Sequence, residues 1–345
     1  LAEAIRKSFM NSPWRIPLTV LIIIALFCGN CAYQAGNVVG ASTGVSIIFG
    51  DNRLIYCLVI SAAALVLSGS IKYISNVLTG IVFLMAVVFL ITAIVVQPDV
   101  GALLRGMVTP TIPEGSMLTA IALIGTTLVP YCIYLHASTN ASKKAADPAM
   151  DVDDVLVDNT YDSVCNAILT AIISVSIMVV GCSLALRGSS VSAVNDLAQG
   201  LEPLAGTWAS YVFAVGIFAA GISSATTAPL AATYVITGIL GWSTDLKDTK
   251  FRIIAVVVFA IGCIAAIMGG TPTDIITIAQ AFNGVVLPLS VCMVAWIATR
   301  PEILGKYVNG AVLNVLSVVV LIITLVMAYR TFVVYAPQIV AMFTA

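Results

Sequence analysis

Residues 125–136 read Gly-Thr-Thr-Leu-Val-Pro-Tyr-Cys-Ile-Tyr-Leu-His, a mostly apolar run that Pro130 interrupts. Proline lacks the backbone N–H and disfavours helix at the residue before it, here Val129. Unwinding at this point would expose the carbonyl groups of Thr126 and Thr127, which can line a cavity and coordinate an ion or a polar solute. The alternative is a simple proline kink, common in membrane helices, and the spacing alone leaves both interpretations open.

The composition around this run indicates a membrane protein. Of the 345 residues, 60% are hydrophobic and 9% are charged, whereas soluble domains carry about 25% charged residues. Apolar stretches of about twenty residues, the length of a membrane-spanning helix, follow one another along the chain. We therefore expect an all-α membrane protein with one transmembrane domain over residues 1–345. The net charge of −1, without clustered Lys and Arg, argues against nucleic-acid binding.

Breaking the chain at charges, prolines and turn residues predicts nine membrane spans. They cover residues 16–49, 54–71, 73–97, 116–139, 163–186, 206–240, 253–270, 275–298 and 308–329. With loops assigned alternately to two sides, one side collects Arg6, Lys7, Arg15, Lys72, Lys143, Lys144, Lys247, Lys250, Arg252, Arg300 and Lys306, and the other Arg53, Arg105, Arg187 and Arg330. Cytoplasmic loops hold the excess of basic residues. The N-terminal end and the polar loop 140–162 are therefore expected in the cytoplasm, and the C-terminal end outside.

The spans contain almost no ionisable side chains, although such groups in a membrane usually mark function. His136 is the one histidine, and no Asp, Glu, Lys or Arg lies within a span, so an acidic proton relay is absent from this sequence. The motifs of zinc proteases, serine hydrolases and P-loop enzymes are absent too, and we expect no enzyme and no cofactor. Cys28 and Cys31 form a CxxC inside an apolar span without a second pair, for which helix packing is the simpler interpretation.

Two further spans carry breaks or polar groups. Residues 219–229, Ala-Ala-Gly-Ile-Ser-Ser-Ala-Thr-Thr-Ala-Pro, combine small residues with a proline, which suits close helix packing as well as a site. Gln280, Asn283 and Pro288 interrupt an apolar span, where the two amides could hold a hydrated cation or bridge helices. Asp274 follows Thr-Pro-Thr and is interpreted as part of a helix start rather than a catalytic group.

These segments resemble the NRAMP family of divalent metal-ion transporters. The family's sixth helix is similar to the stretch Gly-Thr-Thr-Leu-Val-Pro-Tyr-Cys-Ile-Tyr-Leu-His-Ala-Ser, and its eighth helix is similar to residues 218–241. Its tenth helix is similar to Ala-Gln-Ala-Phe-Asn-Gly-Val-Val-Leu-Pro-Leu, and the start of its eleventh is similar to Leu-Gly-Lys-Tyr-Val-Asn-Gly. The resemblance implies a LeuT-like inverted-repeat fold of broken helices, with helices 3 to 11 of the family present. It also implies that the family's first two helices, with the Asp-Pro-Gly-Asn break that supplies a metal carboxylate, are expected upstream of Leu1.

The departures from the family pattern point to a subgroup. Val129 stands where the family has a methionine sulfur ligand, and Tyr131 stands for the first of two histidines, leaving His136 as the second. Gln34 and Asn37 occupy positions where proton-coupled members carry acids. Sites of carbonyls, amides and water suit hard ions such as Mg²⁺, whereas sulfur favours softer ions. These changes resemble the NRAMP-related magnesium transporters, which are not coupled to protons.

The resemblance implies a metal site formed by Thr126, Thr127, Val129, Tyr131, Gln280 and Asn283, and a multi-pass protein of a bacterial plasma membrane that transports Mg²⁺, Mn²⁺ or both. The partners expected are the metal ion, membrane lipid and the upstream helices. Two other functions stay open: a permease of the same fold for a neutral organic solute such as an amino acid, and a helical scaffold without transport. An acidic residue in the upstream break would favour the metal carrier over the permease.

Overall fold

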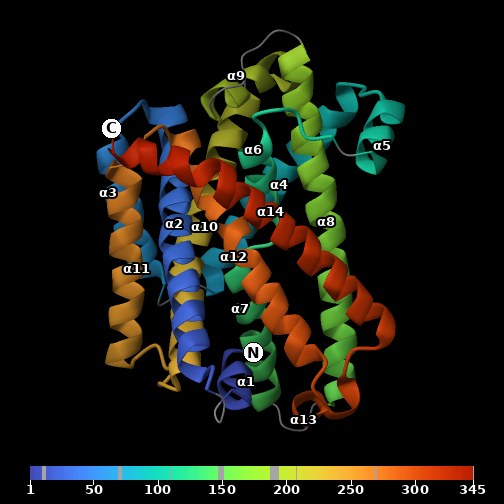
Figure 1. The fold of residues 1–345 in the computed structure, drawn as a ribbon. Helices are drawn as coiled ribbons and strands as arrows, with labels where there is room; N and C mark the ends of the chain where they lie inside the picture. Colours follow the sequence, from blue (N-terminus) through green and yellow to red (C-terminus); the bar gives the residue numbers. More distant parts are fainter. Residues whose placement is uncertain are drawn as a thin grey trace.

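The computed structural model describes residues 1–9, 13–68, 72–109, 111–146, 151–186, 194–206, 208–268 and 270–344, and these form helices without strands (Figure 1). The helices are α1 (Ala2–Ser8), α2 (Arg15–Phe49), α3 (Arg53–Leu67), α4 (Lys72–Val95), α5 (Val100–Val108), α6 (Met117–Thr127), α7 (Pro130–Ala146), α8 (Val152–Leu186), α9 (Val194–Ala205), α10 (Trp208–Leu240), α11 (Thr249–Met268), α12 (Pro272–Ala298), α13 (Pro301–Leu304), the 3-10 turn η1 (Gly305–Tyr307) and α14 (Ala311–Thr344).

The helices confirm the expected all-α membrane protein. Eight segments of the described chain are long and apolar enough to cross a bilayer, one of them formed by α6 and α7 together. The remaining expected span, 54–71, corresponds to α3, which has 15 residues and rises about 22 Å, less than a hydrocarbon core of about 30 Å. The short surface helices α1, α5 and α9 were not predicted as separate elements from the sequence.

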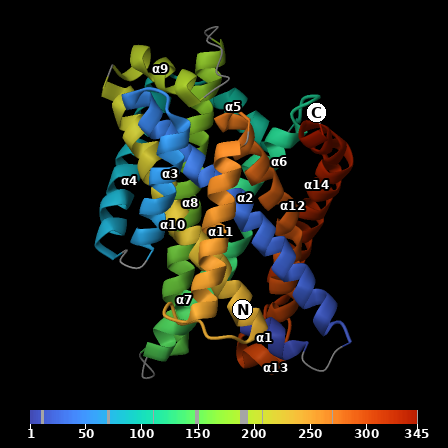
Figure 2. The ribbon, with the colours of Figure 1, turned by 90° about the vertical axis from the view of Figure 1, so that its left-hand side faces the viewer.

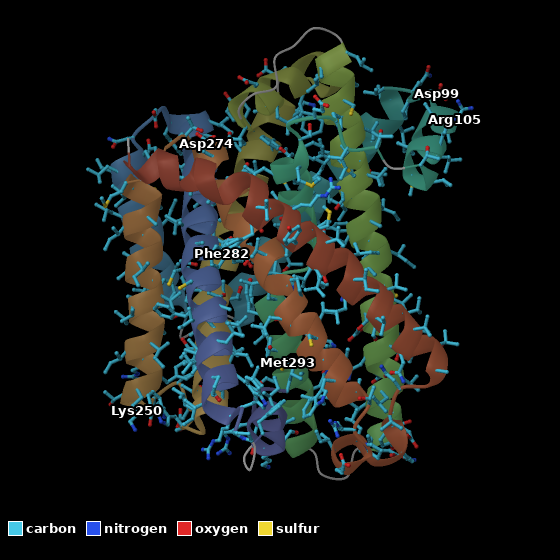
Figure 3. The ribbon with its side chains drawn as sticks, viewed as in Figure 1. Asp99, Arg105, Lys250, Asp274, Phe282 and Met293 are labelled. Atoms are coloured by element: carbon cyan, nitrogen blue, oxygen red, sulfur yellow. The ribbon has the colours of Figure 1, made fainter. Side chains whose placement is uncertain are left out.

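The ends of the helices fall on the two sides that the basic residues predict. Figure 1 shows the N-terminus at the lower end of the bundle, together with the ends of α7 and α10 and with α13, and the C-terminus at the upper end. Lys250 lies at the lower end, and Arg105 and Asp274 at the upper end (Figure 3). Arg187 lies outside the described residues. Termini at opposite ends agree with nine passes among the described residues, the eight long segments and the shorter α3.

The region 140–162 is not the polar loop that its composition suggested. α7 continues to Ala146 and α8 begins at Val152, so helix occupies most of this region. Asp153 and Asp154 lie in the first turn of α8, where the helix dipole and free N–H groups favour negative side chains. The acidic residues that favoured a loop in the sequence therefore lie in the first turn of a helix.

Two helix ends at the upper face are capped by polar groups. Thr271 is the N-cap of α12, its hydroxyl oxygen accepting from the Asp274 N–H at 3.3 Å, and Pro272 follows at the first position. This confirms the interpretation of Asp274 as part of a helix start. At the end of α11, the Arg53 Nε donates to the Ala266 carbonyl at 3.0 Å, and another guanidinium N–H donates to Gly270. A cation at a helix C-terminus satisfies free carbonyls and joins α3 to α11.

Helix α2 lies in the middle of the bundle between α10, α11 and α12 (Figure 2). Glycines permit this close packing. A Cβ added to Gly44 would lie 2.5 Å from the Ala214 carbonyl oxygen, and one added to Gly221 would lie 2.5 Å from the Ala41 nitrogen. The small-residue stretch 219–229 therefore serves helix packing between α10 and α2.

Candidate metal-ion site at a helix break

The chain unwinds between α6 and α7 at the position that Pro130 predicts. α6 ends at Thr127, Leu128 takes a non-helical conformation with φ −128° and ψ 88°, and α7 begins at Pro130. Pro130 has no N–H, so the carbonyl of Thr126 loses its usual donor four residues on. Among the described residues, no backbone hydrogen bond across the break ends on the Thr126 or Thr127 carbonyl. The break is therefore more than a kink, and it leaves acceptor groups free at membrane depth.

The break packs directly against the polar part of α12. A Cβ added to Gly125 would lie 1.9 Å from the Gln280 carbonyl oxygen and 2.7 Å from the Gly284 nitrogen, so the two backbones are in contact. Asn283 is 2% exposed, and its Nδ2 donates to Gln280 Oε1 at 3.3 Å. The fold thus packs α6 at Gly125, just before the free carbonyls, against the part of α12 that carries two paired amide side chains.

Tyr131 and Val129 take part in a different contact. Both are buried and pack in an apolar cluster with Ala228 and Ala231 of α10. The ring of Tyr131 lies 5.5 Å from the ring of Tyr33 on α2, measured between centroids. In this conformation Val129 and Tyr131 therefore form the α10 side of the break, while Gln280 and Asn283 form its α12 side.

The positions of Gln34 and Asn37 on α2 are buried and neutral. Gln34 is 0% exposed and Asn37 8%. The side-chain oxygen of Gln34 and the side-chain nitrogen of Asn37 have no hydrogen-bond partner among the described residues. Asn30, one turn before Gln34, is also buried with an unpartnered side-chain oxygen. These amides follow one face of α2, at a spacing of four and three residues, and form a polar stripe beside α10 and α11.

Gln34 has a structural contact that the sequence did not reveal. Its Nε2 donates to the Ala225 carbonyl of α10 at 3.1 Å. Ala225 lies four residues before Pro229, which cannot supply the N–H that this carbonyl would accept in an uninterrupted helix. Gln34 thus replaces the hydrogen bond that Pro229 removes, and α10 continues through the proline without a break. The unbroken α10 favours the packing interpretation of residues 219–229.

α12 also continues through its proline, Pro288, so the unwound segment 128–129 is the one break inside a described span. His136 lies on α7, exposed and seven residues past the last residue of the break, Val129. Tyr33 and Asn30 are the site neighbours that sequence reasoning missed. The signal for them was a polar residue spacing of three and four along an apolar helix, shared with Gln34 and Asn37.

The donor groups at the break are neutral. Within the described part of the chain, no group of three or more His, Cys, Asp or Glu side chains is close enough to hold a metal ion. Cys28 is exposed and Cys31 buried, both as free thiols, which fits helix packing for the latter. What the break offers a cation is backbone carbonyl, amide and hydroxyl oxygen, the ligand type of hard ions that keep part of their water.

A sequence model of the family described as natural resistance-associated macrophage protein-like, Nramp, matches residues 1–334. The chain belongs to the Nramp family. It is 24% identical over 245 residues to a divalent metal cation transporter MntH of Deinococcus radiodurans, a match covering 70% of this chain and 55% of that protein. It is also 24% identical over 340 residues to an MntH of Yersinia pestis, covering 95% and 79%, and over 330 residues to an MntH of Erwinia tasmaniensis, covering 91% and 75%.

Nramp membership bears on three expectations from the sequence. Nramp proteins are membrane transporters, so the chain is not an enzyme, and no cofactor is indicated; in the relatives, by their name, divalent metal cations are cargo. The family and the apolar helices together make it an integral, multi-pass membrane protein. The Deinococcus match spans little more than half the length of that relative.

Proposed function

We propose that this chain acts in the transport of divalent metal cations across a membrane, with the ion passing the break between α6 and α7. The observation that carries the proposal is the contact of Gly125, which precedes the free carbonyls, with the backbone of Gln280, whose side chain accepts a hydrogen bond from Asn283. The relatives bear the name of divalent metal cation transporters. A neutral-solute permease is not favoured, because nothing among these relatives suggests one.

The proposed ligands are the carbonyls of Thr126 and Thr127 and the side chains of Gln280 and Asn283, with Tyr131 and Val129 shaping the α10 side. Some contacts pass through water, since Mg²⁺ gives up its hydration shell reluctantly. A cation also needs negative charge to offset the cost of dehydration. The proposal includes a carboxylate upstream of Leu1, which the family resemblance implies.

We propose that the site accepts both Mg²⁺ and Mn²⁺ and works by alternating access. Val129 provides no sulfur to favour the softer ion. Proton coupling is not part of the proposal, because Gln34 and Asn37 are amides on the buried stripe of α2. The excess of basic residues at the N-terminal end of the bundle supports a cytoplasmic location of that end, in a bacterial plasma membrane.

Uptake into vesicles containing the intact protein tests this function. Mn²⁺ and Mg²⁺ entry would be followed with metal-sensitive dyes for the parent, for Gln280→Leu and for Asn283→Leu. We expect each change to slow uptake of both ions about tenfold, the effect of losing about 1.4 kcal/mol of binding. Asn76→Leu is the matched control, since Asn76 is an exposed amide on α4, and should leave uptake unchanged. Equal rates for all four proteins would contradict the proposed site.

A further inference from the structure

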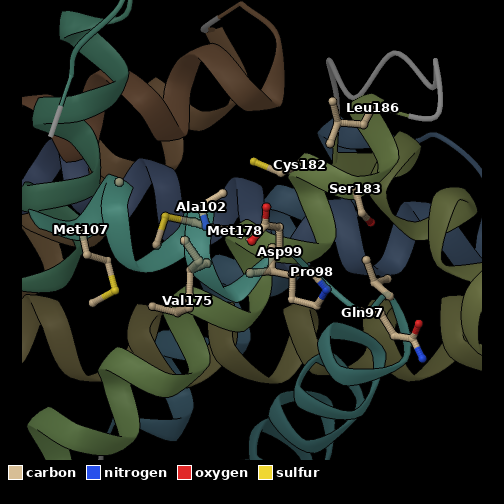
Figure 4. Close-up of a pocket in the computed structure, with 14 residues that line it drawn as sticks. Gln97, Pro98, Asp99, Ala102, Met107, Val175, Met178, Cys182, Ser183 and Leu186 are labelled. Carbon is tan, nitrogen blue, oxygen red and sulfur yellow. Dashed lines mark hydrogen bonds between the residues drawn. The ribbon is translucent and has the colours of Figure 1, made fainter. Parts of the chain in front are cut away.

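A cavity of about 650 Å³ lies between α5 and α8 and shares no residue with the break between α6 and α7. Figure 4 shows its walls, with side chains of α5 and α8 facing one another. The α8 wall uses residues three or four apart, which form one face of the helix. The lining is apolar for the most part and consists of Val96, Gln97, Pro98, Asp99, Ala102, Leu103, Gly106, Met107, Val175, Met178, Val179, Cys182, Ser183 and Leu186. The volume is within the range of about 300–1,000 Å³ common for ligand sites.

Helix α5 forms the outer wall of the cavity, and its apolar side chains are not covered by the rest of the described protein. None of its nine residues is buried, and the exposed fractions include 60% for Val100, 65% for Met107 and 81% for Val108. Contiguous exposed apolar surface of this kind marks contact with lipid or a partner. α5 starts five residues after α4 ends, at the edge of the span, where an amphipathic helix lies in the membrane interface.

The polar groups near the cavity identify the chemistry of the occupant. The carboxylate of Asp99 caps α5, because it accepts a hydrogen bond from the Ala102 N–H at 3.0 Å. The guanidinium of Arg105 is exposed and has no ion pair or hydrogen bond among the described residues. Arg105 does not line the cavity; it lies on α5 between the lining residues Leu103 and Gly106, at the outer edge of the bundle near Asp99 (Figure 3). An unpaired cation on the helix that forms the wall of an apolar cavity, at a membrane boundary, complements a phosphate whose acyl chain enters that cavity.

We propose that this cavity holds one acyl chain of a phospholipid, whose phosphate Arg105 binds, and that the lipid fastens α5 to α8. The site is a lipid site distinct from the path of the transported ion. Its occupant is a phospholipid from the leaflet at the α5 end of the bundle. The proposal does not depend on the ion that the protein carries.

Native mass spectrometry of the intact protein in detergent, titrated with palmitoyl-oleoyl phosphatidylglycerol, tests the site. Gly106 lines the cavity, and an added Cβ there would meet no atom within 4 Å, so Gly106→Phe fills the cavity without a backbone clash. Gly80→Phe on α4 is the matched control, because Gly80 also faces open space and does not line the cavity. We expect Gly106→Phe and Arg105→Gln to weaken the tightest lipid adduct about tenfold, and Gly80→Phe to retain it.

Cys182 gives a second measurement because it lines the cavity, whereas Cys165, also exposed on α8, does not. Alkylation by N-ethylmaleimide, read by peptide mass spectrometry, should slow several-fold at Cys182 when the lipid is added and stay constant at Cys165. Equal slowing at both cysteines, or a tight adduct that survives Gly106→Phe, would overturn the proposal. A protein dimer that Gly106→Phe abolishes would assign the cavity to a second copy instead of a lipid.

Discussion

Gly125 is the residue at which the candidate site has the least freedom. The α6 and α12 backbones meet there so closely that a Cβ would lie 1.9 Å from the Gln280 carbonyl oxygen. Gly284 on the opposite helix is nearly as restricted, with an added Cβ 2.9 Å from the Ile121 carbonyl oxygen. Two facing glycines thus let the end of α6 that precedes the break pack closely against α12, the helix that carries Gln280 and Asn283, and larger residues would separate the two helices.

We expect Gly125→Val to separate α6 from α12, lowering the melting temperature in detergent and abolishing metal uptake. The valine Cβ cannot be accommodated unless a backbone moves, and such overpacking typically costs about 1–3 kcal/mol or more. Gly181→Val on α8 is the control, because a Cβ at Gly181 meets nothing within 4 Å. A Gly125→Val protein as stable and active as the control would show that the close contact is not needed.

Val129→Met tests the selectivity of the proposed site. A thioether at this position should shift uptake from Mg²⁺ toward Mn²⁺, because sulfur favours softer transition ions. We expect the ratio of Mn²⁺ to Mg²⁺ uptake to rise about tenfold, measured as competition between the two ions in vesicles. Val129→Leu, which adds apolar volume without sulfur, is the control. If the parent already excludes Mg²⁺ while Mn²⁺ crosses, the proposal of a hard-ion site is wrong.

At the scale of elements, α6–α7 and α10 show two outcomes of a proline in a membrane helix. Pro130 leaves the Thr126 carbonyl without its donor, and the helix opens. Pro229 removes the same kind of donor from Ala225, but Gln34 of α2 supplies a replacement and α10 stays continuous. Helix α2 therefore contributes to the rigidity of α10, while the segment between α6 and α7 stays unwound and available to an ion.

The role of Gln34 can be separated from that of Pro229 with a double-mutant cycle. Gln34→Leu should destabilise the protein by about 1–3 kcal/mol, because it leaves a buried carbonyl unsatisfied. Pro229→Ala supplies a backbone N–H to Ala225, so the combination should regain most of the lost melting temperature. Additive losses in the double variant would show that Gln34 acts through some other contact.

For the molecule as a whole, the distribution of charged side chains determines how much charge would have to be buried in the membrane. Polar groups inside the bundle, such as the amides of the α2 stripe, are neutral, and charged side chains gather at its two ends (Figure 3). A buried charge would be costly unless it were paired. Among the described residues no Asp or Glu is buried, so the polar interior of the bundle is neutral there, in line with the proposed ion movement without coupled protons.

We expect metal uptake by vesicles containing the intact protein to proceed without proton influx. Acidification would be followed with a trapped pH dye during Mn²⁺ uptake, in the parent and in His136→Ala, which removes the one histidine. Dependence of rate on bulk pH is a separate measurement, since a titrating histidine can change the rate without coupling. Metal-dependent influx that survives His136→Ala would reveal a proton relay outside these residues, and influx abolished by the change would make His136 the coupling group.

The sequence by itself determined the membrane class, the approximate spans and the end of the bundle with more basic residues, and it marked Pro130 as the position of a break or a kink without deciding between them. These depend on local properties: the length of apolar runs, the charges between them, and a proline without an N–H. Only the tertiary structure decided which atoms meet. The Gln34–Ala225 bond joins residues 191 positions apart, and the contact of Gly125 with Gln280 depends on how closely two helices approach. The tertiary structure also shows that Tyr131 and Val129 pack against α10, on a different side of the break from the amides of α12. The direction of a side chain in a bundle depends on its neighbours in space, which the sequence does not give.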